Sequence, residues 1–455
     1  MPRILIFIYI ILSTLGLSSA IAQSGPTTDP QQFVVVPSSG TGTYVGNAGL
    51  KAAITAANAA TGPATVVIKA GSYSLDIGAP LPPLTKTDGL TIRGEGSAGV
   101  RIVIPCDPSI PDSINGRLFT LQGSYIDITN ITVVMQPSCA AYKNVPFGIE
   151  SGNDFSITDI TLLNPTGFTV IGTSSTAPQR VTFRDIHGLN WKAAYGLSAI
   201  NVVQAQSILF EDILFNAGDV CNSDTRSVQI KPVGLTDTIV MRRVSIFNSA
   251  ICTGSPKPTT TAVTLDFSLG SIVNVWMDDC VFDATTLHGV EILSSGSNPT
   301  FAGNIRFRNC SFNAQAGGDS VFISLKDPNA NMQTIEFDHN VMVSRNHAAI
   351  VLDSASTGIA RALHFDGNDI NTATTGWSGP GVAVSLGMDN FTFIGNHNTV
   401  ADTGTPVTHP GSIFFQTTKA VQNGIIQGNF SSVASTTLDT SGGTITPSAV
   451  SGNIP

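Results

Sequence analysis

Two neighbouring stretches, Val273-Asn-Val-Trp-Met-Asp-Asp-Cys-Val-Phe282 and Asn304-Ile-Arg-Phe-Arg-Asn-Cys-Ser-Phe312, carry the same order of apolar and polar residues. The apolar or small positions that match are Val275 with Ile305, Met277 with Phe307, Cys280 with Cys310, and Phe282 with Phe312. Alternation over so few residues indicates a β-strand. Recurrence of one pattern along the chain indicates a structural repeat.

The repeat extends over most of the chain. With Met277 and Phe307 as reference positions, the pattern recurs at Ile92, Ile128, Ile157, Phe183, Phe210, Met241, Phe337, Phe365, Phe393 and Ile426. A second alternating run precedes many of these positions, at residues 227–231, 262–266, 289–293, 320–324, 349–353 and 381–385. No segment between these runs has the helical period, and Gly, Asn, Ser and Thr are abundant at the bends. These features predict a parallel β-solenoid.

Two columns of residues follow each reference position. The residue two positions later is Asn130, Asp159, Asp185, Asp212, Arg243, Asp279, Asn309, His339, Gly367, Gly395 or Gly428. Apart from Arg243, these residue types tolerate the left-handed backbone of a sharp corner. The next residue is Ile131, Ile160, Ile186, Ile213, Val244, Cys280, Cys310, Asn340, Asn368, Asn396 or Asn429. This second column predicts an internal stack that ends in an asparagine ladder.

The N-terminal region contains a predicted export signal and a predicted cap. Residues 1–22 have an apolar run followed by Ala20-Ile-Ala22, which is typical of a secretory signal peptide, with a signal anchor as the alternative. Residues 23–88 hold a first strand at 33–36 and an amphipathic helix at 47–60. For this helix we expect Asn47 as N-cap, with Leu50, Ile54 and Ala57 on one face. We expect the β-solenoid to occupy residues 89–430, and residues 431–455 to form a C-terminal cap or a loose tail.

The repeat, the helix and the "AGSY" (residues 70–73) and "LTIRGEG" (residues 90–96) sequences resemble the right-handed parallel β-helix of the pectate-lyase-like superfamily. The resemblance covers nearly the whole mature chain. It implies an all-β fold of about 11–12 coils with an N-terminal capping helix. It specifies the fold more closely than the function.

Composition and charge restrict the partners. The formal net charge of −9 argues against nucleic acid as a ligand, and no segment after the signal is apolar enough for a membrane helix. We expect a soluble protein that is secreted, periplasmic or attached to the cell surface. A polysaccharide is the expected partner, and the sequence leaves the oligomeric state open.

The six cysteines form three pairs of sequence neighbours. Cys221 and Cys252 each follow their reference positions by eleven residues, and Cys280 and Cys310 are also in register. Strands ~4.8 Å apart are close enough for disulfides. Cys106 and Cys139 are the third pair. For Cys280 and Cys310, two buried free thiols are an equal alternative to a bond.

The run that precedes the reference position offers the most chemistry. Its alternation directs Gln229, Lys231, Asp266 and Glu291 outward on three consecutive coils. Lys231 should lie beside Asp266, and Asp266 should lie diagonally about 8 Å from Glu291. Two carboxylates at this separation would suit an inverting glycosidase.

Two alternatives to hydrolysis remain open for this patch. Carboxylates, with Asp224 and Glu291 as candidate ligands, could hold Ca²⁺ against a uronate while Lys231 or an arginine removes a proton. The neighbouring Asp219, Arg226 and His288 could complete either site. A simple surface salt bridge between Lys231 and Asp266, beside a solvated Glu291, is the non-functional alternative.

A second outward-facing set lies on the strand of the reference positions. Trp276 should point outward between Val240 and Arg306, either to stack on a sugar or to lie beneath a loop. The outward charges one position after the references alternate in sign, as in Arg184, Glu211 and Arg242. Such a pattern favours a ladder of surface ion pairs over a binding strip.

Catalytic motifs of the superfamily are matched only in part. The stretch around Trp276, followed by Leu287-His-Gly-Val-Glu291, resembles the pectate lyase phrases V-W-I-D-H and D-G-x-x-D, with Asp279 in place of the His and Glu291 in place of a calcium ligand. The segment with that family's catalytic arginine is absent. Polygalacturonase-like fragments occur at 222–224, 278–279, 287–289 and 229–231, but Lys231 comes too early. The D-P-H motif of the β-helical mannuronan epimerases is also missing.

The sequence therefore favours two functions. The first is an exported lyase or glycoside hydrolase acting through Lys231, Asp266 and Glu291 on an extracellular glycan, with uronate-containing glycans among the candidates. Trp276, Gln229, Arg226 and His288 would then contact the substrate, and Ca²⁺ is the candidate cofactor. The second is a non-catalytic surface or spike-like protein that binds glycan on its side.

Overall fold

A computed structural model describes residues 30–75, 81–95, 99–105, 117–136, 145–165, 167–191, 198–217, 225–247, 260–284, 287–294, 301–314, 318–326, 331–345, 350–353, 359–373, 382–384, 388–399, 413–417, 421–431, 436–439 and 445–452. The predicted signal peptide, together with Cys106, Cys139, Cys221, Cys252, Asp219 and Asp224, lies outside these residues. None of the helices in the described part is long and apolar enough to cross a membrane.

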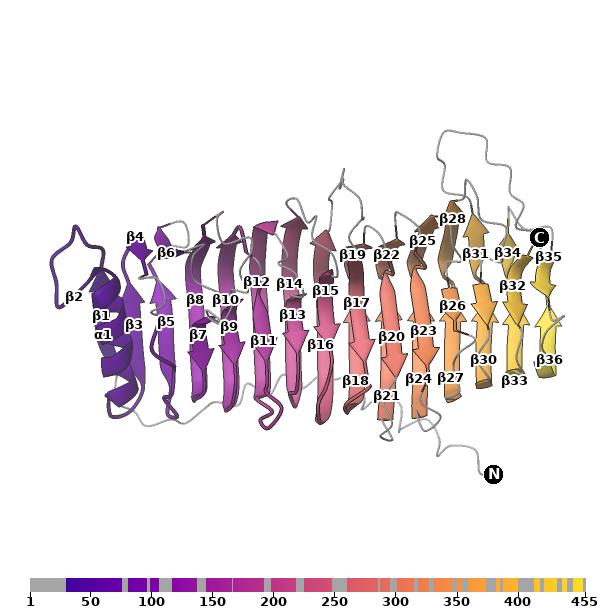
Figure 1. The fold of residues 1–455 in the computed structure, drawn as a ribbon, viewed down its shortest axis with the longest axis horizontal. Coiled ribbons are helices and arrows are strands. Elements are labelled where there is room, and N and C mark those ends of the chain that lie inside the picture. Colours follow the sequence, from indigo (N-terminus) through magenta and orange to yellow (C-terminus); the bar gives the residue numbers. More distant parts are fainter. Residues whose placement is uncertain are drawn as a thin grey trace, which may run out of the picture.

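The chain winds into a right-handed parallel β-helix whose strands succeed one another along a single axis (Figure 1). We call the two sheets A and B. Sheet A contains 24 of the described strands and sheet B contains 12. Within each sheet the neighbouring strands pair in parallel, as β10 and β12 do in sheet A and β15 and β17 do in sheet B. The all-β parallel solenoid predicted from the sequence, with its N-terminal helix, is confirmed.

The strands of sheet A are β1 (Gln31–Val36), β2 (Tyr44–Val45), β3 (Ala64–Ile68), β4 (Gly71–Ser74), β5 (Leu90–Gly94), β6 (Val100–Ile104), β8 (Ser124–Met135), β10 (Asn153–Leu163), β12 (Gln179–Trp191), β14 (Ser207–Ala217), β16 (Leu235–Phe247), β18 (Ser271–Asp278), β19 (Val281–Ala284), β21 (Phe301–Arg308), β22 (Ser311–Ala314), β24 (Asn331–Asp338), β25 (Val341–Arg345), β27 (Ile359–Asp366), β28 (Asp369–Ala373), β30 (Met388–Ile394), β31 (His397–Thr399), β33 (Val421–Gln427), β34 (Phe430–Ser431) and β36 (Ile445–Ser451). Those of sheet B are β7 (Arg117–Leu121), β9 (Val145–Ile149), β11 (Thr169–Ile171), β13 (Ser198–Val202), β15 (Thr225–Ile230), β17 (Thr260–Asp266), β20 (Val290–Ser294), β23 (Val321–Leu325), β26 (Ile350–Leu352), β29 (Val382–Val384), β32 (Ile413–Thr417) and β35 (Thr436–Asp439).

The predicted corner column adopts the left-handed conformation throughout. All eleven residues, from Asn130 to Gly428, have φ between 50° and 64°. Arg243, the residue type that did not fit the column, is held there by its neighbours. Its Nε donates to Asp212 Oδ1 (2.6 Å), and its Nη2 donates to Asp212 Oδ2 (2.9 Å) and Glu211 Oε1 (3.0 Å). These charge-assisted bonds across the corner offset the steric cost of a left-handed arginine.

The second column lies inside the stack. All eleven of its side chains, from Ile131 to Asn429, are at most 1% exposed. From Asn368 onward, each Oδ1 accepts from the backbone N and the Nδ2 of the preceding asparagine, as Asn368 does from Asn340 (2.9 and 3.0 Å). Asn340 Oδ1 accepts from the backbone N of Cys310 (2.8 Å). Each Nδ2 also donates to a backbone carbonyl, as Asn368 does to Phe337 (2.9 Å). The predicted ladder therefore exists, and it satisfies polar groups that burial would otherwise leave without partners.

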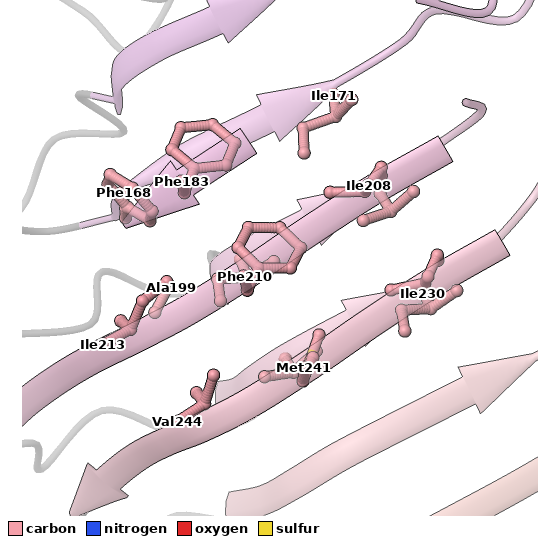
Figure 2. Packing of buried hydrophobic residues seen from close by; sticks show 14 of the residues in the cluster. Phe168, Ile171, Phe183, Ala199, Ile208, Phe210, Ile213, Ile230, Met241 and Val244 are labelled. Carbon is pink, nitrogen blue, oxygen red and sulfur yellow. The ribbon is translucent and has the colours of Figure 1, made fainter. Parts of the chain in front are cut away.

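The reference positions fill the interior between the two sheets. Figure 2 shows Phe183 and Phe210 from sheet A packing among aliphatic side chains such as Ile171 and Ile230 from sheet B. The rings of Phe183 and Phe210 stack with centroids 5.2 Å apart and planes 5° apart. Side chains in register on successive coils thus form one continuous apolar core.

Helix α1 (Gly46–Ala59) packs against β1 and β3 at the N-terminal end of the stack, where a cap was predicted (Figure 1). Its face of Leu50, Ile54 and Ala57 is fully buried, as expected. The prediction of Asn47 as N-cap was wrong. The chain enters the helix directly from β2, so the extended N-cap position falls on Val45, and Asn47 Oδ1 accepts from Ala48 N (2.8 Å).

The solenoid continues beyond residue 430. Strand β36 pairs with β33 from Val421–Ile445 to Gln427–Ser451, and β35 pairs with β32. Residues 436–439 and 445–451 therefore belong to the solenoid, and the alternative of a loose tail is wrong for them. These strands were missed because their Ser- and Thr-rich sequence weakens the apolar alternation.

Cys280 and Cys310 are buried free thiols, so the disulfide alternative for this pair is wrong. Their register is as predicted, because Ser311 N donates to Cys280 O (2.8 Å) across the two coils. The thiols point to backbone carbonyls instead of forming a bond: Cys280 Sγ lies 3.3 Å from Asp278 O, and Cys310 Sγ lies 3.3 Å from Met277 O. Burial raises the pKa of the Cys280 thiol well above its usual value.

We predict that Asn368→Ala destabilises the protein by about 3–5 kcal/mol, because it leaves the Asn340 amide and the Phe337 carbonyl buried without their partners. Urea denaturation followed by circular dichroism measures this loss. Asn216→Ala, at an exposed asparagine on β14, is the control and should change stability by less than about 0.5 kcal/mol. Equal effects of the two substitutions would show that the ladder does not stabilise the stack.

Candidate functional site

The outward residues of sheet B gather on four consecutive strands, β15, β17, β20 and β23. Gln229 pairs with Thr264, Thr264 with Glu291, and Glu291 with Phe322. Lys231 follows Ile230, which pairs with Leu265, so Lys231 lies next to Asp266. We call the surface formed by Lys231, Asp266, His288, Glu291 and Asp319 the acidic wall.

Asp266 is held as a carboxylate by its neighbours. Lys231 Nζ lies 2.8 Å from Asp266 Oδ2, and Ser268 donates to Oδ1 from its backbone N (3.0 Å) and its hydroxyl. Burial alone would raise the pKa of Asp266, but these bonds outweigh it, and the pKa is lowered. Asp266 is therefore ionised at neutral pH.

Glu291 occupies the centre of the acidic wall. It is 9% exposed, and its Oε2 accepts from Thr264 Oγ1 (3.2 Å). Because Thr264 is its register partner, Glu291 lies two residues along and one coil across from Asp266, roughly 8 Å away between Cα atoms. The diagonal arrangement expected from the sequence is present.

Asp319, which the sequence patterns did not indicate, lies beside His288. His288 Nδ1 is 3.5 Å from Asp319 Oδ2, and the His288 ring stacks on Phe322 with centroids 4.7 Å apart and planes 8° apart. The side chain of Asp319 is 8% exposed, and burial raises its pKa to about 7. Asp319 was missed because it precedes the alternating run, although aligning Leu287-His288-Gly289 with Gly318-Asp319-Ser320 would have found it.

The remaining candidates are Arg226 and Gln229, predicted to contact the substrate, and Asp224, predicted to bind Ca²⁺. Arg226 and Gln229 lie on β15 beside the acidic wall, in register with Thr261 and Thr264.

Among the residues that the structure describes, no group of three or more His, Cys, Asp or Glu side chains could hold a metal ion. The Ca²⁺ hypothesis also depends on Asp224, outside these residues, and remains a prediction.

Trp276 does not share a sheet with the acidic wall. It lies on β18 of sheet A, half-buried, between Val240 and Arg306 as expected. The Arg306 guanidinium lies 5.7 Å from its ring centroid and donates to both oxygens of Asp278 (3.0 and 3.1 Å). The structure therefore does not bring Trp276 together with Lys231, Asp266 and Glu291.

The outward charges of sheet A form ion pairs, though not always the expected ones. Arg184 Nε donates to Glu211 Oε2 (2.8 Å), as the alternating signs predicted. Glu211 then pairs with Arg243 of the corner, although its register partner is Arg242. Exposed pairs of this kind contribute little and do not indicate a binding strip.

Comparison with known proteins identifies the fold. No protein-family model matches the chain, and no curated protein matches its sequence. The A-module of the Azotobacter vinelandii mannuronan C-5 epimerase AlgE4 has a similar structure, with a TM-score of 0.55 at 14% identity, covering 92% of this chain and 100% of that module. This similarity establishes the parallel β-helix and does not extend to the chemistry.

Two further structures show lower similarity. The catalytic domain of a GH87 alpha-1,3-glucanase in complex with nigerose gives a TM-score of 0.38 at 11% identity, over 93% of this chain and 69% of that one. PfbA, a surface adhesin of Streptococcus pneumoniae, gives 0.38 at 12% identity, over 88% of each chain.

The raised pKa of Asp319 predicts a pH-dependent stability. Folded Asp319 keeps its proton up to about pH 7, whereas the unfolded side chain loses it near its ordinary value of 3.8. Between these values the folded state binds more protons, so this group lowers the free energy of unfolding as pH rises. The effect is absent below the unfolded value and complete above about 7. Each tenfold difference in proton affinity between the two states corresponds to about 1.4 kcal/mol.

We therefore predict that Asp319→Asn gains a few kcal/mol of stability relative to the wild type as pH rises from about 4 to about 7. Urea midpoints measured across this range test it. Asp237→Asn, at an exposed site, should follow the wild type. A difference between Asp319→Asn and wild type that does not vary with pH would contradict the prediction.

Proposed function

We propose that this protein is an exported enzyme that cleaves an extracellular polysaccharide on the acidic wall, by glycoside hydrolysis. The observation that carries this proposal is the placement of Asp266, Glu291 and Asp319 on three consecutive coils of one surface, in different electrostatic environments. Glycoside hydrolysis requires one carboxylate and one protonated carboxyl group. The surroundings of the two groups must therefore give them different pKa values. The mannuronan epimerase with this fold acts, by its name, on a polysaccharide, which is compatible with the proposal.

Hydrolysis fits the geometry better than lyase chemistry. A lyase would need a base beside the substrate, and the sequence offers Lys231 or an arginine for this role. The Lys231 Nζ already forms an ion pair with Asp266 Oδ2 at 2.8 Å, so it is directed at a carboxylate of the protein. Lys231 instead suits binding of sugar hydroxyl or carboxylate groups at the edge of the wall.

A non-catalytic glycan-binding or structural protein is the second candidate. It is favoured by the mutual satisfaction of Lys231, Asp266 and Ser268, which is what a purely structural surface would show. It is also consistent with the incomplete catalytic motifs. The two candidates differ in whether any glycan is cleaved.

A screen of neutral and acidic polysaccharides, with and without EDTA, distinguishes these functions. We expect new reducing ends without ultraviolet absorbance from unsaturated uronides, and we expect EDTA to leave the rate unchanged. Absorbance from unsaturated uronides would identify a lyase. Co-sedimentation with a polysaccharide that is never cleaved would identify a binding protein and contradict the proposal.

Glu291→Gln should reduce kcat on the cleaved polysaccharide by at least about 100-fold, because the amide cannot exchange the proton that the reaction transfers. Asp278→Asn is the control, since this carboxylate lies on sheet A, away from the acidic wall, where it pairs with Arg306. It should retain the wild-type rate. Activity that survives Asp266→Ala and Glu291→Ala together would place the site elsewhere.

A further inference from the structure

We propose that Asp319 is the general acid of the acidic wall, that Glu291 is its partner base, and that His288 is the positioning residue for Asp319. This assignment rests on the proposed hydrolase function and deepens it. It identifies the group that protonates the leaving sugar, which Asp266 and Glu291 alone leave unassigned.

The geometry joins the three residues through one aromatic ring. Phe322 is the register partner of Glu291, and the His288 ring lies parallel to it at 4.7 Å. His288 in turn lies 3.5 Å from Asp319. The stack on Phe322 orients the His288 ring, and the ring in turn contacts the Asp319 carboxyl, so His288 is placed to position that group.

The separation of the two carboxyl groups suits an inverting reaction. Glu291 and Asp319 are one coil (~4.8 Å) and about three residues (~10 Å) apart, so their Cα atoms lie roughly 11 Å apart. The arrangement leaves room for a glycosidic bond and one water molecule between the carboxyl groups.

Asp266 is unsuited to donate the proton. The Lys231 ammonium and the two Ser268 donors all stabilise its ionised form, and its pKa is lowered. Asp319 has the opposite environment, because burial raises its pKa to about 7. Two carboxyl groups with oppositely shifted pKa values on one surface suggest different roles in proton transfer.

The titratable groups of the neighbouring coil of β20 are His288 and Glu291. His288 Nδ1 lies 3.5 Å from Asp319 Oδ2, whereas Glu291 lies roughly 11 Å from Asp319 between Cα atoms. The raised pKa of Asp319 is due to burial and not to a neighbouring negative charge.

The proposed step is balanced in protons and bonds. Asp319 gives its proton to the glycosidic oxygen as the bond from that oxygen to the anomeric carbon breaks. A water molecule attacks the anomeric carbon from the opposite side, and Glu291 takes a proton from it. The step leaves Asp319 ionised and Glu291 protonated, and exchange with solvent restores both.

The test compares two substrates: the polysaccharide cleaved by the wild type in the screen, and a dinitrophenyl glycoside of the same oligosaccharide. The dinitrophenolate leaves without protonation, so loss of the acid should matter only for the polysaccharide. We expect Asp319→Asn to lose at least about 100-fold in kcat on the polysaccharide but less than about 10-fold on the dinitrophenyl substrate. Glu291→Gln should lose activity on both.

The position of His288 is tested by the pH profile. In the wild type, kcat should fall as Asp319 loses its proton near pH 7. His288→Gln should shift the pH at which kcat falls, and it should lower kcat with little change in KM. A purely structural effect would leave the pH of this fall unchanged. His339→Gln is the matched control, because His339 forms a similar contact with Asp338 on sheet A and is far more exposed.

The outcomes separate the two proposals. If the wild type cleaves the polysaccharide and Asp319→Asn loses equal activity on both substrates, or none on either, the assignment of the acid is overturned while the hydrolase function stands. If the wild type cleaves no glycan, the hydrolase function fails, and the assignment fails with it.

Discussion

The structure depends on the in-register hydrogen bonding of parallel coils, which makes residues about thirty positions apart into nearest neighbours. That register is maintained at one corner of the coils from Asn130 to Gly428, where a residue with positive φ turns the strand and the next side chain points inward. In the later coils the inward residue is asparagine, whose amide bonds to the coils on both sides. Backbone turn, buried amide and stacked phenylalanine therefore repeat together, and a shift of register would disrupt all three.

This dependence explains which features the sequence could predict. The period of the apolar pattern translates directly into neighbours in space, so the corner column, the buried column and the adjacency of Lys231 and Asp266 all followed from counting residues. Features that depend on the local direction of the chain could not be predicted from the period of the pattern. The N-cap of α1 shifted to Val45 because β2 leads straight into the helix.

The residues of the acidic wall could likewise be predicted only in part from the sequence pattern. The alternating run placed Glu291 correctly, but Asp319 precedes the run on its own coil, where the chain bends and alternation ceases to indicate direction. Its burial, its raised pKa and its contact with His288 are consequences of tertiary packing. Opposite environments for Asp266 and Asp319, one beside an ammonium and one in a poorly solvated position, are what distinguish this surface from the exposed ion pairs of sheet A.

A crystal structure of the Glu291→Gln variant soaked with an oligosaccharide of the cleaved glycan tests the assignment of the acidic wall most directly, because it shows which surface binds sugar. We expect the sugar to lie across β17, β20 and β23, with a glycosidic oxygen within hydrogen-bonding distance of Asp319. Sugar bound on sheet A over Trp276, with the outer face of sheet B empty, would contradict this assignment.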